Sequence, residues 1–239
     1  MNIKIITRLL LIVGSAFFGE QVLAEGDSLF RARAHAGLSS YALTLTGAGS
    51  EEPDATSNYL SAGVGLTYAT GNIYIDFAYS QSINAEHDWP GFEGEFERTD
   101  TATTVGYLLN GGWSAFGGYK YGRSDFYRDS RPGYKLTFEA YGLFGGVSKS
   151  IILKNGSSVL LSGAVAFMTG DVYDNNTLDD SGSAIGTSFA AAYNLPIGND
   201  SGLQLRGSYQ YYSFTEFNSP QLDAVETIFS ADAAYYLNF

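Results

Sequence analysis

The chain has 239 residues, no cysteine and a formal net charge of −12 at pH 7. Without cysteine there are no disulfides, no thiolate catalysis and no cysteine metal sites. The acidic balance excludes a nucleic-acid binder, which needs a basic surface. A mean hydropathy of −0.05 is too polar for a helical membrane protein, whereas 18 tyrosines and 16 phenylalanines against 5 prolines favour β-structure.

The first 24 residues have the pattern of a secretory signal peptide. Lys4 and Arg8 are followed by the apolar run Leu9–Phe18, and Ala24 precedes the expected cleavage site. This run is too short to cross about 30 Å of hydrocarbon as a helix. We therefore expect residues 25–239 to be exported as a single domain.

The exported chain is predicted to form ten strands, because alternating apolar and polar runs of about 9–11 residues recur along it. Short connections carry turn residues around Gly71, Gly111 and Gly156 and between residues 194 and 202. Long polar connections lie near residues 47–57, 84–98, 124–133, 170–182 and 215–223. This all-β pattern is typical of a closed antiparallel up-and-down transmembrane β-barrel, with short periplasmic turns, long extracellular loops and both termini in the periplasm. Eight strands is the alternative count, and a soluble β-sandwich is the alternative fold.

The last predicted strand, Val225–Phe239, alternates apolar and polar residues and closes on phenylalanine. Because strand side chains repeat every two residues, its apolar side chains share one face, which would meet lipid. This ending resembles the terminal signal by which outer-membrane barrels are recognised. Tyr235, Leu237 and Phe239 are therefore the expected signal for the barrel-assembly machinery.

The same phases predict a set of charged residues that face the barrel interior. These are Arg33, His35, Asp76, Asp100, Lys120, Arg206, Glu226 and Asp232. Both signs are present, so we expect them to neutralise one another in a narrow, plugged or finely channelled lumen. Arg206 and Glu226 lie in neighbouring strands and are expected to pair. Leu43 and Leu45 fall in register with Arg33, which predicts a bulge or an extramembrane extension in the first strand.

Glycine and aromatic residues combine in a predicted hairpin that includes Thr104–Tyr107 and Trp113–Gly122. The chain resembles the small monomeric outer-membrane barrels, such as the opacity-type adhesins and the membrane domain of the A-type outer-membrane protein. The resemblance implies a bacterial outer-membrane location, a monomer, and outer-membrane lipids and lipopolysaccharide as partners. We do not expect the peptidoglycan-gripping role of the A-type protein to carry over, because residues 25–239 are expected to form the barrel alone.

One predicted loop is basic. Arg123, Arg128 and Arg131 are candidates for contact with lipopolysaccharide phosphates, because guanidinium groups offer bidentate hydrogen bonds. Pairing of these side chains with the acidic loop at residues 84–98 is the alternative.

The sequence offers no strong catalytic or metal-binding constellation. His35 has Ser39 nearby, as a lipid hydrolase would need, but along a strand these residues are two pleats apart. His87 adjoins Asp88, whereas the ten-stranded omptin proteases use rim pairs spaced by one residue. Asp171–Asp180 is rich in oxygen ligands but lacks the glycine and terminal glutamate of a calcium loop. We therefore predict no catalytic residue, metal or cofactor.

These observations favour a structural or adhesin-like surface-interaction barrel of the outer membrane. A narrow passive, porin-like channel is the first alternative. A barrel hydrolase acting on lipid or peptide is the second.

Overall fold

The computed structural model describes residues 28–47, 50–51, 55–89, 91–215, 217 and 223–239. The predicted signal peptide lies outside these residues. No helix within them is long and apolar enough to cross a membrane.

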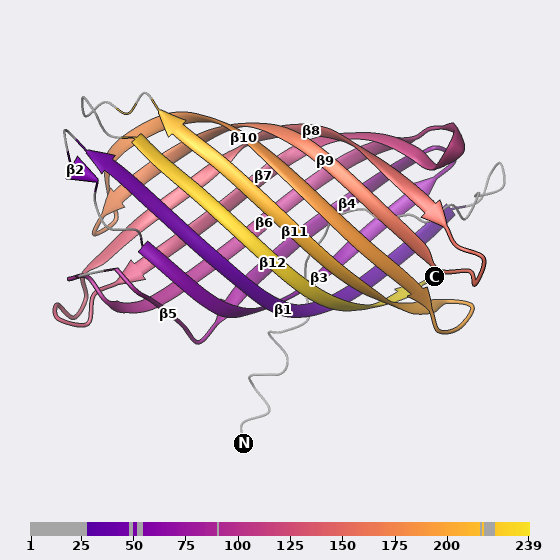
Figure 1. Cartoon of the computed structure of the whole chain (residues 1–239), viewed down its shortest axis with the longest axis horizontal. Coiled ribbons are helices and arrows are strands. Elements are labelled where there is room, and N and C mark those ends of the chain that lie inside the picture. Colours follow the sequence, from indigo (N-terminus) through magenta and orange to yellow (C-terminus); the bar gives the residue numbers. More distant parts are fainter. Residues whose placement is uncertain (1–27, 48–49, 52–54, 90, 216, 218–222) are drawn as a thin grey trace, which may run out of the picture.

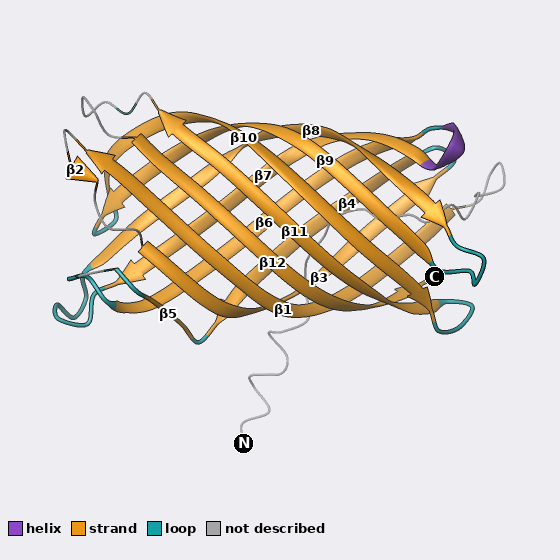
Figure 2. Ribbon diagram, in the orientation of Figure 1, coloured by secondary structure: helices purple, strands orange, loops and turns teal. Residues whose placement is uncertain are grey.

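Ten long strands form a closed antiparallel barrel (Figures 1 and 2). They are β1 (Ser28–Gly47), β3 (Ala55–Thr70), β4 (Ile73–Ile83), β6 (Gly94–Leu108), β7 (Trp113–Tyr127), β8 (Lys135–Ile152), β9 (Ser158–Asp174), β10 (Thr177–Pro196), β11 (Ser201–Thr215) and β12 (Asp223–Asn238). Each pairs with the next along the chain, and β12 pairs with β1 to close the ring. Two short strands, β2 (Ser50–Glu51) and β5 (Ala85–His87), pair with β1 and β6, and a 3-10 turn occupies Asn110–Gly112. The predicted ten-stranded, all-β closed barrel is confirmed.

The two ends of the barrel differ, and we call them the turn end and the loop end. The turn end holds the predicted short turns and the chain end at Phe239, which lies beside Phe30 of β1. Gly71, Gly111 and Gly156 have φ values of +54°, +70° and +79°, the left-handed region that favours glycine. The loop end holds β2, β5 and the other connections.

The predicted long loop at residues 170–182 is wrong. Strands β9 and β10 continue through it and are joined at Asn175 and Asn176, which have φ values of +48° and +65°. Two consecutive left-handed residues make the tight turn that a β-hairpin needs, and asparagine tolerates them. The segment resembles a loop in sequence because many of its side chains are polar, although its backbone is paired apart from a register irregularity between Leu178 and Asp180.

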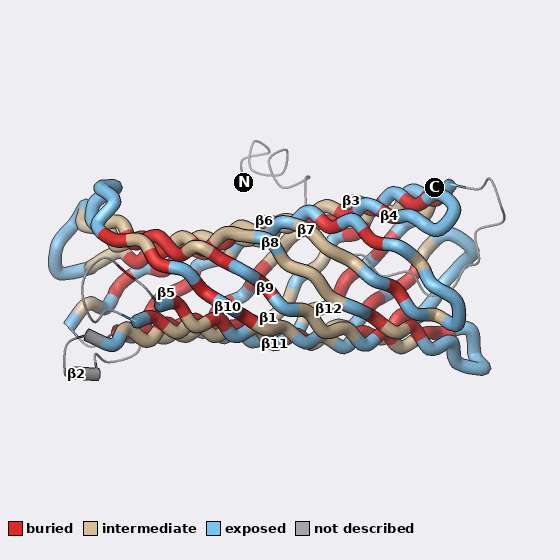
Figure 3. Tube along the Cα trace, turned by 90° about the horizontal axis from the view of Figure 1, so that it is seen from above, coloured by how far each residue is buried: buried red, intermediate tan, exposed pale blue. Residues whose placement is uncertain are grey.

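Inward and outward positions alternate along the long strands, and burial alternates with them over much of their length (Figure 3). The outward apolar side chains form a band around the barrel, which we call the belt. Strongly exposed members of the belt include Leu38, Leu60, Leu143, Phe167, Ile185, Phe189 and Leu205. Nine of the long strands have 15–20 residues and β4 has 11, whereas about 9–11 suffice for a crossing. The strands therefore continue past the belt toward the loop end, and we call that part the rim half and the belt part the belt half.

The predicted bulge in the first strand is wrong. The register of β1 with both β12 and β3 is continuous, and Leu43 keeps the inward phase of Arg33. Leu43 is buried in an apolar cluster inside the rim half. The 20-residue length of β1 instead fits the alternative expectation of an extension beyond the belt.

Inward aromatic rings lie over glycines of the neighbouring strand. Phe116 of β7 is the register partner of Gly146 in β8, and Phe144 of β8 is the partner of Gly118 in β7. A Cβ added at Gly146 would lie 2.7 Å from Phe116 Cζ, and one at Gly118 2.8 Å from Phe144 Cζ. Other register pairs of this kind are Tyr74–Gly106, Tyr212–Gly186 and Tyr236–Gly202. Only glycine leaves room for these rings.

Candidate functional site

The lumen of the rim half is filled by an aromatic core. Its larger members are Tyr41, Leu43, Tyr59, Trp89, Phe96, Phe126, Phe138, Met168, Val172, Tyr212, Phe214 and Ile228. Ring centroids of Phe96 and Phe126 are 5.2 Å apart, and those of Phe138 and Phe214 are 5.1 Å apart. These are the separations of packed aromatic pairs in protein interiors. The lumen at this end is therefore packed with side chains in the way that a soluble protein packs its interior.

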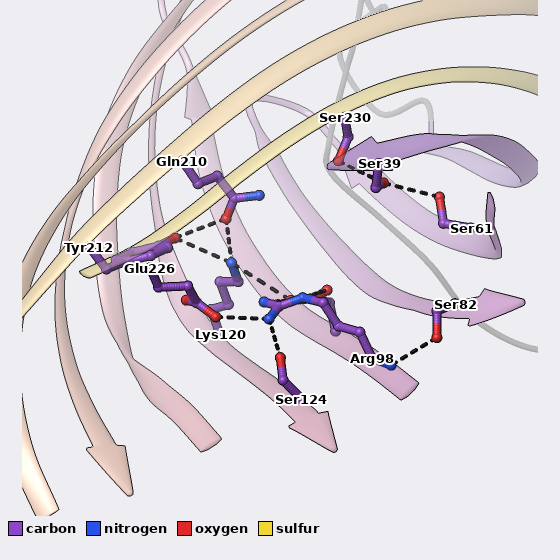
Figure 4. Close-up of polar contacts among 11 residues, drawn as sticks. Ser39, Ser61, Ser82, Arg98, Lys120, Ser124, Gln210, Tyr212, Glu226 and Ser230 are labelled. Atoms are coloured by element: carbon purple, nitrogen blue, oxygen red, sulfur yellow. Dashed lines mark hydrogen bonds and ion pairs between the residues drawn. The ribbon is translucent and has the colours of Figure 1, made fainter. Parts of the chain in front are cut away.

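Directly beneath the core, Arg98 of β6 links three strands across the lumen (Figure 4). Its Nη1 donates to Glu226 Oε1 and to Ser124 Oγ at 2.8 and 2.7 Å, and its Nε and Nη2 donate to the Asp100 carboxylate at 2.8 and 2.9 Å. The guanidinium also lies over the ring of Tyr41, 4.8 Å from its centroid. A buried cation with two carboxylates and a hydroxyl has its hydrogen-bonding capacity well satisfied.

Arg98 was missed by the sequence analysis, which assigned it to a loop. The available signal was its phase, because Arg98 and Asp100 are two residues apart and must share a face of the strand.

The predicted pairing of Arg206 with Glu226 is wrong. In the register of β11 and β12, Arg206 faces Asp232, and Glu226 faces Tyr212. Glu226 lies six residues from Asp232 along β12, about 20 Å at the rise of a strand. Arg206 and Glu226 therefore lie at different heights in the barrel. Glu226 instead forms an ion pair with Arg98 across the lumen.

Lys120 of β7 extends the polar layer toward β11. Its Nζ donates to Gln210 Oε1 and, at 3.2 Å, to the Tyr212 hydroxyl, and it lies 3.8 Å from Asp100 Oδ1. A second buried ion pair stands nearer the turn end. There Arg33 Nη2 donates to both Asp76 carboxylate oxygens at 2.8 and 3.1 Å, and the Thr67 hydroxyl donates to the same carboxylate at 2.5 Å.

Between these layers lies a cavity of about 210 Å³ at the height of the belt. His35, Arg206 and Asp232 line it, so all eight charged residues predicted for the interior have inward phase. Nine serines contribute hydroxyl groups to the wall: Ser39, Ser61, Ser80, Ser82, Ser148, Ser162, Ser188, Ser208 and Ser230. Ser39 Oγ is 3.1 Å from Ser230 Oγ and 3.4 Å from Ser61 Oγ. No hydrogen bond joins Ser39 to His35 in the described structure, so these two residues do not form a nucleophile and base pair.

At the loop end, His87 lies against the aromatic core. Its Nε2 is 2.9 Å from the Tyr127 carbonyl oxygen, and its ring contacts Phe92 and Phe126 at centroid distances of 5.7 and 5.3 Å. Burial lowers the pKa of His87 more than the Tyr127 carbonyl and nearby carboxylates raise it. The side chain is packed rather than presented to a substrate, which does not match a hydrolytic His–Asp pair.

The three candidate lipopolysaccharide contacts occupy different places. Arg123 faces outward from β7 just beyond the belt, where it pairs with Asp125 and Glu139 at 3.0 Å each. Arg128 donates to the Gly91 carbonyl oxygen at 2.7 Å and lies over Phe92, so it contacts the acidic segment through a backbone carbonyl and an aromatic ring. Arg131 lies over the ring of Tyr134.

The predicted assembly residues end β12 at the turn end. Tyr235, Leu237 and Phe239 all face outward. Backbone hydrogen bonds of 2.8 and 3.2 Å join Phe239 to Phe30, and their ring centroids are 6.0 Å apart. These contacts anchor the last residue of the chain to its first described strand.

A closed ten-stranded barrel with an apolar outer belt and a polar lumen is the architecture of outer-membrane β-barrel proteins. Among solved structures, the outer membrane protease OmpT from Escherichia coli is similar with a TM-score of 0.60 at 10% identity, over 90% of this chain and 97% of that chain. The β domain of the Bordetella autotransporter BrkA aligns at 15% identity over 89% and 99%, with a TM-score of 0.45. Ail of Yersinia pestis aligns at 12% identity over 89% and 99%, with a TM-score of 0.37. No protein-family model and no curated protein sequence matches this chain.

At these identities the likeness concerns the fold alone. The predicted resemblance to small outer-membrane barrels is confirmed at that level.

Proposed function

We propose that this protein resides in the bacterial outer membrane as a barrel with a closed lumen, and that it acts through its outer surface as a structural or surface-interaction protein. The observation that carries the proposal is the aromatic core above Arg98, which leaves the rim half filled with side chains. In this proposal the turn end and both termini are periplasmic, and the loop end is extracellular.

Ion conductance across planar lipid bilayers tests the closed lumen. The purified protein is expected to insert without a stable conducting state. Steady single-channel currents from the unaltered protein would replace the proposal with the narrow-channel alternative, which the central cavity of about 210 Å³ favours.

The outer surface beyond the belt is uneven, and this supports a role in contact. Charged side chains of outward phase gather on β6 to β9. Glu95, Glu97, Arg123, Lys135 and Glu139 are at least partly exposed there, whereas Asp125 and Asp171 are buried among their neighbours. On the described outward faces of β11, β12, β1, β3 and β4, Asp223 is the one charged residue. Bulk solvent beyond the belt is the same on all sides of the barrel, so a one-sided charge pattern suits a specific neighbour.

We propose lipopolysaccharide as that neighbour, with Arg123 the contact nearest the belt. The Arg123 side chain is 34% exposed despite its ion pairs. Arg123→Gln is expected to weaken lipopolysaccharide binding by the reconstituted protein about ten-fold, since a hydrogen bond to a charged group contributes about 1.5–3 kcal/mol. Lys149→Gln, at the turn end, is the matched control and should bind as the parent does. Equal binding by Arg123→Gln and the parent would remove Arg123 from the proposal.

A further inference from the structure

The segment between β4 and β6 packs across the aromatic core, and we call residues 85–89 and 91–93 the cap segment. Ala85, His87 and Trp89 are buried in it, alternating with exposed Glu86 and Asp88. Trp89 lies 5.8 Å from Phe126 between ring centroids. The cap segment therefore covers core side chains that would otherwise face the loop end.

Backbone pairing holds the first part of the cap segment, because β5 pairs with β6 from Ala85–Phe96 to His87–Gly94, and further polar contacts join the segment to other strands. Backbone hydrogen bonds of 3.1 and 2.7 Å join Thr56 and Asp88, and the Ser57 hydroxyl donates to the Glu86 carbonyl at 2.6 Å. On the other side, Asp129 N donates to the Glu93 carbonyl at 3.0 Å. The segment is bounded by Asn84 and contains Gly91, whose φ values of +46° and +80° mark changes of chain direction.

His87 is at the centre of these contacts, and its tautomer follows from its partner. The Tyr127 carbonyl oxygen only accepts, so Nε2 carries the hydrogen and donates it. Nδ1 of the neutral ring is therefore unprotonated, and it is buried without a hydrogen-bond partner among the described residues. A second proton on Nδ1 would place a charged N–H group among aromatic rings with no acceptor, which is unfavourable.

The charged groups around His87 lie at the surface. Asp88 and Glu93 belong to the cap segment, Asp129 belongs to the connection after β7, and all three are exposed. Arg128, over Phe92, is the nearby cation. An imidazolium released into water would approach the three carboxylates while regaining hydration, so both effects favour release of a protonated His87.

We propose that the cap segment is an acid-released lid, which detaches from the aromatic core when His87 is protonated while the barrel stays folded. The burial of His87 makes the neutral form the one that fits the closed lid. Closure is thus fully stabilised above the ordinary histidine pKa of 6.5 and is lost as pH falls below it.

The chain supplies its own reporter for this movement. It has two tryptophans, Trp89 in the cap segment and Trp113 at the turn end. In a Trp113→Phe background, acrylamide quenching of Trp89 is measured in detergent micelles from about pH 8 to about pH 4.5. Quenching is expected to rise at least about two-fold as the lid is released, with unchanged far-ultraviolet circular dichroism.

His87→Gln keeps a side-chain N–H for the Tyr127 carbonyl but does not titrate, so its quenching should stay low throughout. His35→Gln removes the other histidine of the chain and is the matched control, which should respond as the parent does. A response retained in His87→Gln, or absent from the parent, would overturn the lid. Because His35→Gln leaves His87 as the sole histidine, its ring can also be titrated by NMR, and a pKa at or above 6.5 would overturn the proposal even if His87→Gln failed to fold.

Discussion

In the belt half of the barrel the outside is apolar and the lumen is polar, whereas in the rim half the outside is polar and the lumen is apolar. Strand β1 shows both: Leu38 faces outward between inward His35 and Ser39, while farther on Thr44 faces outward between inward Leu43 and Leu45. No bulge separates the two patterns. Each strand therefore keeps the same inward and outward positions along its whole length. Between the belt half and the rim half, polar and apolar residues exchange places at those positions.

In the proposed outer-membrane location, this exchange follows from the solvent on each side of the barrel wall. Lipid requires an apolar exterior over the belt, so the polar residues that remain must face the lumen and pair there. Beyond the belt the exterior meets water, and burial of aromatic side chains in the lumen becomes the main source of stability, as in soluble proteins. Arg98 and its partners lie at the boundary between the two environments.

The largest loss of stability is expected when the Arg98 side chain and its ion pairs are removed from this boundary. Arg98→Ala leaves Glu226 and Asp100 without their shared cation and should lower the free energy of unfolding by about 3–5 kcal/mol. Urea unfolding in lipid vesicles measures it. Lys149→Ala, which removes a partly exposed outward cation at the turn end, is the control and should change the free energy of unfolding by less than about 1 kcal/mol. Adding Glu226→Gln to Arg98→Ala should restore part of the loss, and a purely additive double variant would show that the pair is not coupled.

Opening the aromatic core should have a somewhat smaller effect on stability and a visible effect on permeability. Phe126→Ala removes a fully buried ring and is expected to cost about 3–4 kcal/mol. If the core closes the lumen, the same variant should also show intermittent ion conductance in planar bilayers. Phe229→Ala changes an outward belt residue and is the control for conductance. A stable but silent Phe126→Ala variant would mean that the seal lies elsewhere, for example at the Arg33–Asp76 layer.

The smallest effect is expected in the cavity. Ser39→Ala removes a hydroxyl whose partners, Ser61 and Ser230, also line the cavity and can bond to water there. Unfolding should become easier by less than about 1 kcal/mol. A loss of about 2 kcal/mol or more would instead indicate a dry cavity, because its hydroxyls would then depend on one another.

The belt half could be predicted from the sequence because its rule is local. The outward rows of the strands, including Val225–Phe239, follow from alternation alone, and so does the inward phase of Arg33 and Asp76. In the rim half the same reasoning gave wrong predictions. There an outward polar residue such as Asp171 indicates a loop when lipid is assumed outside, and an inward Leu43 indicates a bulge.

The ion pairs that cross the lumen also could not be predicted from the sequence. Arg98 and Glu226 are 128 residues apart in the chain, and their meeting depends on the registers of all the strands between them. The paired register of β11 and β12 would have sufficed to reject Arg206 as the partner of Glu226, but alternation gives phase and not register.

A strand that slips by two residues keeps every side chain on its correct face, so alternation of faces cannot prevent that error. The aromatic rings that lie over glycines can prevent such a slip. Slipping β8 by two residues along β7 in one direction would set Phe116 directly opposite Phe144, and two rings would need the space that one glycine now leaves open. The sum of the registers around a closed barrel fixes the strand tilt and the barrel diameter. These glycines therefore also help to set the diameter of the barrel.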